Sequence, residues 1–224
     1  MSDDSFIREV EEELRTEQLQ NFWSKYGKLI IAAAVAIVVG VAGFRYYEYS
    51  SAQSAAENGD AFMEAVRLAN DDKGDEAIVA LEKIQTDGSS AYKVIAKMRI
   101  AAELHKKGES AKAVEAFDQV IADSGADENF RSISRIRAAM ILVDTGSVAD
   151  VETRVSPLMG PTSTYLPSAR EALGLAHFKA GDLTKAFEQF EALDKDLETP
   201  TNMKQRVTIM LGLIAAQGGP VRES

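Results

Sequence analysis

Apolar and polar positions divide the chain into three successive patterns. Before about residue 25, apolar residues recur at near-helical spacing and acids occupy the opposite face. From Leu29 to Phe44, sixteen residues carry no charge. From about Ala69 to the end, apolar positions recur at helical spacing in segments of about 11 to 18 residues, without convincing period-two alternation. We therefore predict an all-α chain with an amphipathic helix, a long apolar helix and a helical domain without a sheet.

The apolar stretch has the length and the flanks of a membrane-spanning helix. Its sixteen uncharged residues alone would span about 24 Å, less than the roughly 30 Å of bilayer hydrocarbon. Counting from Tyr26 to Tyr47 extends the helix to about 33 Å. Aromatic rings favour the headgroup level, and the side chains of Lys28 and Arg45 are long enough to reach it. We expect a transmembrane helix at residues 26–48.

Two other interpretations of this stretch are a cleaved signal peptide and the core helix of a soluble domain. Small residues at the spacing of a cleavage site occur at 40–42 (Gly-Val-Ala) and 50–52 (Ser-Ser-Ala). A signal peptide, however, begins with a short basic region, whereas 28 residues with seven acids and four bases precede this core. A soluble core helix rarely remains uncharged on all sides between basic and aromatic flanks. We therefore favour an uncleaved signal anchor.

Basic residues predict the orientation of the anchor. Four bases precede the span, and only Arg45 lies within the first twenty residues after it. Lys and Arg favour the cytoplasmic side, so we expect a cytoplasmic N-terminus. Residues 46–224 would then lie in the periplasm of a Gram-negative bacterium, which makes the chain a single-pass inner-membrane protein.

The segment before the span reads as an amphipathic helix over residues 5–24, with Ser5 as its N-cap. It is either a cytoplasmic docking helix or a helix at the membrane surface. The acidic run of residues 11–13 disfavours anionic lipid, so we favour contact with a protein.

A repeat of about 36 residues organises the remainder of the chain. In each unit, a turn residue is followed five positions later by Ala or Val and nine positions later by Leu, Phe or Val. The four sets are Asp72, Ala77 and Leu81; Gly108, Ala113 and Phe117; Gly146, Val151 and Val155; Gly181, Ala186 and Phe190. The turn residues are 36, 38 and 35 positions apart.

This spacing predicts four helical hairpins. A glycine with φ > 0 would end the first helix of a hairpin. Glu109, Ser147 and Asp182 would open the second helix. A small side chain there allows close approach, and the bulky one fills the gap between hairpins. A last helix at about 200–216 would cap the stack.

The unit resembles the tetratricopeptide repeat, a 34-residue hairpin with Gly, Ala and Phe in this arrangement. Clear copies cover residues 90–123 and 163–196, and the other two are degenerate. We divide the chain into a cytoplasmic segment (1–25), the anchor (26–48), a tetratricopeptide-like α-solenoid (49–217) and a flexible tail (218–224).

The whole layout resembles the YfgM-like family, bacterial ancillary subunits of the Sec translocon. The match comprises "YGKLIIAAAVAIVVGVAGFRYYEY" and the repeats, which together cover nearly the whole chain. The resemblance implies a periplasmic tetratricopeptide-like domain without catalytic residues. It also implies three kinds of partner: Sec translocon subunits, a membrane-anchored periplasmic foldase and newly exported proteins.

Composition and motifs argue against a catalytic, cofactor-binding or metal-binding role. The chain has no Cys, which excludes disulfides and thiol catalysis. Its net charge of −10 disfavours nucleic acid. His105 and His177 fall near helix ends, without zinc-ligand spacing around them. Since nucleophile triads and phosphate-binding loops are missing too, we expect no enzyme, no cofactor, no metal and no small-molecule substrate.

Two sets of residues are candidates for contacts with other proteins. Solenoids bind partners on the face formed by the first helices of their hairpins. The candidates there are Tyr92, Arg99, Arg131, Arg135, Arg170 and His177. Arg135 and Arg137 could both pair with acids of a partner, and pairing with the chain's own surface acids is the alternative. In the anchor, Ala32, Ala36 and Gly40 form a small-residue stripe that permits packing against another helix, although Ala-rich spans show such stripes by chance.

These features favour a membrane-anchored protein-interaction module near the translocon that assists exported proteins. The same fold also suits a scaffold for cell-envelope or division machinery. A third hypothesis is a regulator that acts through the cytoplasmic segment.

Overall fold

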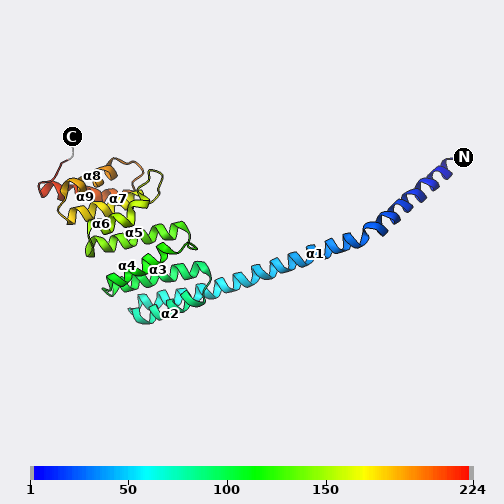
Figure 1. Cartoon of the computed structure of the whole chain (residues 1–224), viewed down its shortest axis with the longest axis horizontal. Coiled ribbons are helices and arrows are strands. Elements are labelled where there is room, and N and C mark those ends of the chain that lie inside the picture. Colours follow the sequence, from blue (N-terminus) through cyan, green and yellow to red (C-terminus); the bar gives the residue numbers. More distant parts are fainter. Residues whose placement is uncertain (1–2, 222–224) are drawn as a thin grey trace. The chain divides into compact units, whose positions relative to one another are not determined.

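The computed structural model describes the backbone of residues 3–221 and the side chains of residues 23–221. Within this part of the chain every regular element is helical, and no strand occurs. The helices are α1 (Asp3–Asn70), α2 (Gly74–Asp87), α3 (Ser90–Lys106), α4 (Ser110–Ala122), α5 (Glu128–Thr145), α6 (Val148–Val155), η1 (Ser156–Leu158), α7 (Leu166–Lys179), α8 (Leu183–Lys195) and α9 (Thr201–Ala216) (Figure 1). The predicted all-α fold class is confirmed.

The chain divides into two compact units, Met1–Ala55 and Ala56–Ser224. In the first unit, α1 contains the predicted span. Its most apolar 18-residue window has a mean hydropathy of 2.3, and only 6% of that window is buried. By length and composition it is the one described helix that could cross a membrane. The side chains of the predicted amphipathic face at residues 5–22 lie outside the described side chains. The prediction of Ser5 as the N-cap is wrong, because α1 already begins at Asp3.

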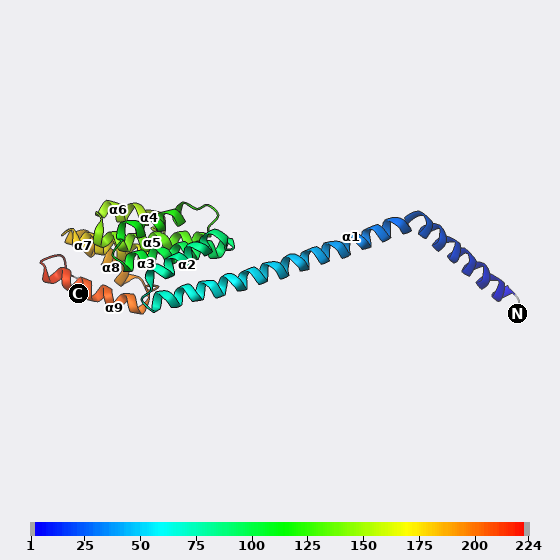
Figure 2. The ribbon, with the colours of Figure 1, turned by 90° about the horizontal axis from the view of Figure 1, so that it is seen from below.

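The second unit is a stack of helical hairpins (Figures 1 and 2). We call the first helix of each hairpin its A helix and the second its B helix. The A helices are the end of α1, α3, α5 and α7, and their B helices are α2, α4, α6 and α8. Each helix from α2 to α9 packs against the next one in the chain, and the A helices α3, α5 and α7 also pack on one another in series. This is the predicted hairpin array.

The repeat positions form the core of the stack. All eight small and bulky residues of the four predicted sets are buried. A further set of small residues lies on the A helices, twelve positions before the small B-helix residue. It comprises Ala65, Ala101, Ala139 and Gly174. At Gly174 the approach leaves no room for a side chain, because an added Cβ would lie 2.9 Å from Phe190 Cε2. The A-helix set therefore decides how closely the B helix approaches.

Three of the four hairpin turns contain a residue with positive φ. They are Asp72 at 59°, Gly108 at 81° and Gly181 at 80°. The same prediction for Gly146 is wrong, because its φ is −116°. Here the N–H of Gly146 donates to Leu142 O at 2.8 Å, and the chain leaves α5 extended. The capping box of the following helix, formed by Ser147 and Asp150, completes this turn without a left-handed residue.

The predicted helix-opening residues cap their helices in two of three cases. The Ser147 hydroxyl accepts from Asp150 N, and the Asp182 carboxylate accepts from Lys185 N. Glu109 occupies the N-cap of α4 without such a bond, because its carboxylate pairs with Lys107 and Lys112 instead.

Polar contacts join each hairpin to the one before it at a spacing of about one repeat. Lys106 donates to Ala69 O at 3.3 Å and to Asp72 Oδ1 at 2.8 Å. Lys179 donates to the carbonyls of Val143 and Asp144. Both lysines thus satisfy carbonyls at the end of the preceding A helix, where the helix dipole favours a cation.

Two bidentate arginine–carboxylate pairs also join successive parts of the stack. Arg154 on α6 donates to both oxygens of Asp118 on α4, at 3.0 and 2.7 Å. Arg206 on α9 donates to both oxygens of Glu171 on α7, at 2.6 and 2.9 Å. In all four of these connections, the donor belongs to the later hairpin and the acceptor to the earlier one.

Helix α9 covers the end of the stack, close to the predicted range of 200–216. It buries one apolar face against α8 and the end of α7. The buried residues of this face are Met203, Val207, Leu211 and Ile214. They meet Phe190 and Leu193 of α8, which would otherwise be exposed.

Candidate protein-interaction site

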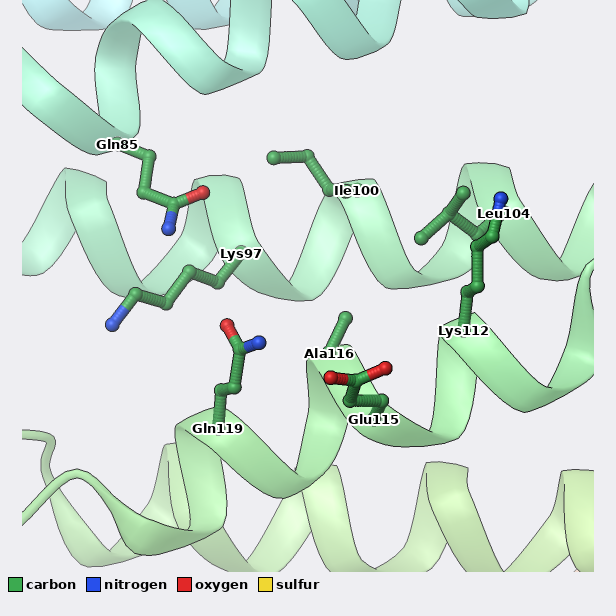
Figure 3. A pocket seen from close by; sticks show the side chains of 8 residues that line it. All are labelled: Gln85, Lys97, Ile100, Leu104, Lys112, Glu115, Ala116 and Gln119. Atoms are coloured by element: carbon green, nitrogen blue, oxygen red, sulfur yellow. The ribbon is translucent and has the colours of Figure 1, made fainter.

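Two hollows of the repeat domain lie on different sides of α3. The first, the α2–α4 groove, has a volume of about 230 Å³. Gln85 of α2, Lys97, Ile100 and Leu104 of α3, and Lys112, Glu115, Ala116 and Gln119 of α4 line it (Figure 3). The groove carries both signs of charge. Lys97 pairs with Asp123 and Lys112 pairs with Glu109, so its cations are already engaged.

The second hollow, the α3–α5 pocket, lies between the A helices of successive hairpins. Its volume is about 310 Å³, and Ala102, His105, Phe117, Arg137, Met140 and Ile141 line it. Phe117 and Ile141 are buried residues of the core, whereas Met140 is 38% exposed. Four of the six lining side chains are apolar, and the two polar ones are both bases.

Helix spacing explains why these side chains meet. Ala102 and His105 are three residues apart on α3, and Arg137 and Met140 are three residues apart on α5. Ala102 is small, so it leaves room between the two helices that a larger residue would fill. The pocket therefore forms because small and long side chains face each other across a hairpin boundary.

The predicted partner-binding residues do not gather in either hollow. Tyr92 packs edge-on against Phe62, with ring centroids 6.3 Å apart, and so ties α3 to the end of α1. Arg99 pairs with the buried Glu103 at 2.8 Å, and Arg131 pairs with Glu128. These contacts are internal to the chain.

The remaining candidates have different surroundings. The Nε atoms of Arg135 and Arg170 are buried, and within the described structure neither atom has a hydrogen-bond partner. His177 Nδ1 lies 3.8 Å from Asp182 Oδ2 at the turn between α7 and α8. Whether any of these residues contacts another protein stays a prediction.

From the sequence we predict Arg137 as an arginine that could pair with a partner's acids but do not place it on the concave face, and it lines the α3–α5 pocket. One signal pointed to it. Arg137 stands nine positions before Gly146, and Arg99 stands nine positions before Gly108. The two arginines therefore occupy the same repeat position on neighbouring A helices.

The histidines lie at helix ends. His105 and His177 belong to the last turns of α3 and α7, and His105 Nδ1 is 3.3 Å from the Ser110 hydroxyl. Across the described residues, no group of three or more His, Cys, Asp or Glu side chains is arranged to hold a metal ion.

The small-residue stripe of the anchor is exposed along α1. Ala32, Ala36 and Gly40 make no contact that buries them. A Cβ added at Gly40 would meet nothing within 4 Å. The surface is open to another helix, and its use stays a prediction.

The fold and these surfaces define a class of protein. A stack of helical hairpins with hollows between its helices is the architecture of tetratricopeptide-like interaction modules. The apolar face of α1, uncovered by protein, is suited to a lipid bilayer. The chain thus combines an interaction domain with a helix that could anchor it.

Comparison with known proteins agrees with this class. The model of a tetratricopeptide repeat-like domain family matches residues 20–215. An ancillary SecYEG translocon subunit of Escherichia coli (strain K12) is 30% identical over 189 residues, which are 83% of this chain and 88% of that protein. An ancillary SecYEG translocon subunit of Haemophilus influenzae is 24% identical over 184 residues, 81% and 88% of the two chains. No solved structure matches significantly.

This chain belongs to the family of the ancillary SecYEG translocon subunits, the YfgM-like family that the sequence resembles. Membership and the single apolar helix near the N-terminus fit a single-pass protein of the bacterial inner membrane.

Proposed function

We propose that the chain is an ancillary subunit of the SecYEG translocon that binds other proteins through its hairpin stack. The observation that carries the proposal is the similarity to a relative of that name over 83% of this chain. The family model, which matches residues 20–215, includes both the anchor region and the repeats. Its partners are subunits of the channel, a membrane-anchored periplasmic foldase and newly exported proteins.

The proposal includes an orientation. Four bases precede the span and one follows within twenty residues, which favours a cytoplasmic N-terminus and a periplasmic repeat domain. The anchor then holds the stack beside the exit of the channel, where exported chains emerge unfolded. A binding module without catalytic residues suits that place.

Site-specific photocrosslinking tests the proposed partners. A photoreactive phenylalanine analogue at Met140, in the α3–α5 pocket, is expected to trap channel subunits, a foldase or an exported chain in native membranes. The same group at Val79, which is 66% exposed on α2, controls for random collision. Trapping of division or cell-wall proteins instead would favour the scaffold hypothesis, and trapping of none of these proteins would contradict both.

Protease protection tests the orientation. In spheroplasts with an intact inner membrane, added protease should degrade the repeat domain and spare residues before the span. Degradation of the repeat domain only after lysis of the inner membrane would overturn the proposed orientation.

A further inference from the structure

The α3–α5 pocket has the surface of a site for an apolar side chain. Its lining combines the buried core side chains of Phe117 and Ile141 with the more exposed side chains of Ala102 and Met140. Its volume of about 310 Å³ lies at the lower end of the range for ligand pockets, roughly 300–1,000 Å³. It therefore suits one anchoring side chain of a peptide rather than the surface of a folded domain.

The charges around the pocket have one sign. Arg137 and His105 are its only polar lining residues, and no acid is among the side chains that line it. In a chain with 35 Asp and Glu against 25 Lys and Arg, the polar side chains that line this pocket are nevertheless both basic. A ligand that brings a carboxylate to this rim meets attraction, and a basic one meets repulsion.

Arg137 is an exposed cation at the rim of this pocket, whereas Arg135 and Arg170 are half-buried and their unpartnered Nε atoms are buried. The Arg137 side chain takes part in no hydrogen bond or ion pair within the described structure. Neighbouring cations on the A helices are engaged: Arg99 with Glu103, Lys106 with Asp72, and Lys179 with the end of α5. A guanidinium offers planar, bidentate donors that match a carboxylate, so Arg137 selects for Asp, Glu or a C-terminal carboxylate.

We infer that the α3–α5 pocket binds an extended acidic peptide segment, inserting one apolar side chain between Ala102 and Met140 and setting a neighbouring carboxylate against Arg137. This inference rests on the proposed role in binding proteins and names the kind of segment that is bound. The partner is recognised by an apolar residue flanked by acids. The α2–α4 groove lacks this chemistry because its cations are paired and Glu115 lines it.

Peptide binding to the full chain in detergent micelles tests the inference. The probe is a fluorescein-labelled nine-residue peptide in which Leu and Asp alternate, followed by fluorescence anisotropy. Two matched probes replace every Asp by Lys or every Leu by Ser. The Leu–Asp probe is expected to bind at least tenfold more tightly than either matched probe and to weaken as salt is added. Equal binding of the Lys probe would overturn the inference.

Variants locate the site. Arg137→Glu should weaken the Leu–Asp probe about tenfold or more, and Ala102→Phe, which fills the pocket, should do the same. Lys83→Glu makes the same charge change at an exposed position of α2, and Ala116→Phe fills the α2–α4 groove (Figure 3). Both controls should bind as the unaltered chain does. Unchanged binding by Arg137→Glu and Ala102→Phe, with helical content retained, would contradict the assignment.

A parallel co-purification separates this inference from the proposed function. The unaltered chain is recovered from membranes in mild detergent, and SecYEG subunits are sought by immunoblotting. Recovery of SecYEG without selective peptide binding removes the pocket inference alone. Selective peptide binding without SecYEG removes the translocon proposal and leaves the pocket intact.

Discussion

Side-chain size at one position of each A helix determines how closely the two helices of a hairpin approach. In the fourth hairpin that position is Gly174, and the buried ring of Phe190 lies directly against it. A glycine inside a helix is ordinarily unfavourable by about 1 kcal/mol relative to alanine. Its presence in α7 is explained by the ring, which leaves no space for a Cβ.

Replacing Gly174 by Val should destabilise the repeat domain by about 1–3 kcal/mol, because the new side chain overlaps the Phe190 ring. Gly212→Val is the matched control, since Gly212 lies in α9 with nothing within 4 Å of an added Cβ. That control should stay within about 0.5 kcal/mol of the unaltered chain. Urea unfolding followed by circular dichroism measures both. Equal stability of the two variants would refute the packing argument.

Lys106 joins α3 to the end of α1 by charge as well as by hydrogen bonds. Its hydrogen bond to Asp72 lowers the pKa of that carboxyl below its usual range, and the same contact raises the pKa of Lys106. A lowered carboxyl pKa contributes stability above the unfolded value near 3.8, which is lost as pH falls through the folded pKa. A raised lysine pKa contributes stability below the unfolded value near 10.5, which is lost as pH rises through the folded pKa.

The stability difference between the unaltered chain and Lys106→Met should therefore stay constant from about pH 5 to 9. It should shrink below about pH 4 and above about pH 10.5. Part of the difference should persist in acid, because the bond from Lys106 to Ala69 O does not require an ionised carboxyl. Thermal unfolding across this pH range provides the measurement. A difference that grows on acidification would show that the pair is not the cause.

At the scale of the element, α9 ends the stack without a B helix of its own. Its inner face covers Phe190 and Leu193, and its outer face carries Ile209, which is 62% exposed. Terminal helices of solenoids protect the last interface from solvent. The contribution of α9 to stability should therefore depend on one face only.

Val207→Asp places a charge on the buried face of α9 and should destabilise the domain by about 3 kcal/mol or more. Ile209→Asp introduces the same charge two positions later on the exposed face. Its effect should stay within about 0.5 kcal/mol. Limited proteolysis of the two variants would compare them, and α9 should be released first in Val207→Asp. Similar resistance of both variants would contradict the assigned role of α9.

Helices and hairpins could be predicted from the sequence where a pattern of residues is compatible with only one kind of packing. The repeat of small and bulky residues located four hairpins, since helix pairs need that alternation to pack. The helical stretch after Pro200 located α9. Gly146 was mispredicted because glycine serves two kinds of turn, and a capping box at Ser147 removed the need for positive φ. The pocket could not be predicted because its charge depends on which arginines form ion pairs in the folded structure. Arg99 has Glu103 one turn away, whereas Arg137 has no such partner among the described residues.

At the scale of the whole molecule, the proposed function needs the anchor to choose a neighbour as well as to hold the domain at a membrane. The stripe of Ala32, Ala36 and Gly40 is the surface of α1 that permits the closest approach. Bulky residues would hold another helix at a distance. Lateral association through this stripe is therefore part of the proposal.

The double variant Ala36→Leu, Gly40→Leu should lower recovery of SecYEG with the chain several-fold in mild-detergent co-purification. Val38→Leu with Ala42→Leu places two leucines at the same spacing on the opposite side of the helix, and it should leave recovery unchanged. Membrane insertion of both variants, checked by carbonate extraction, keeps the comparison valid. Full recovery with the first variant would exclude the stripe as the contact.

The direction of the contacts between hairpins has a consequence for how the domain is completed. Lys106, Arg154, Lys179 and Arg206 all reach back to acceptors that precede them in the chain. Synthesis proceeds from the N-terminus, so every acceptor has left the ribosome before its donor arrives. Until the later hairpin is made, the edge of the growing stack therefore carries acceptors whose donors have not yet been synthesised.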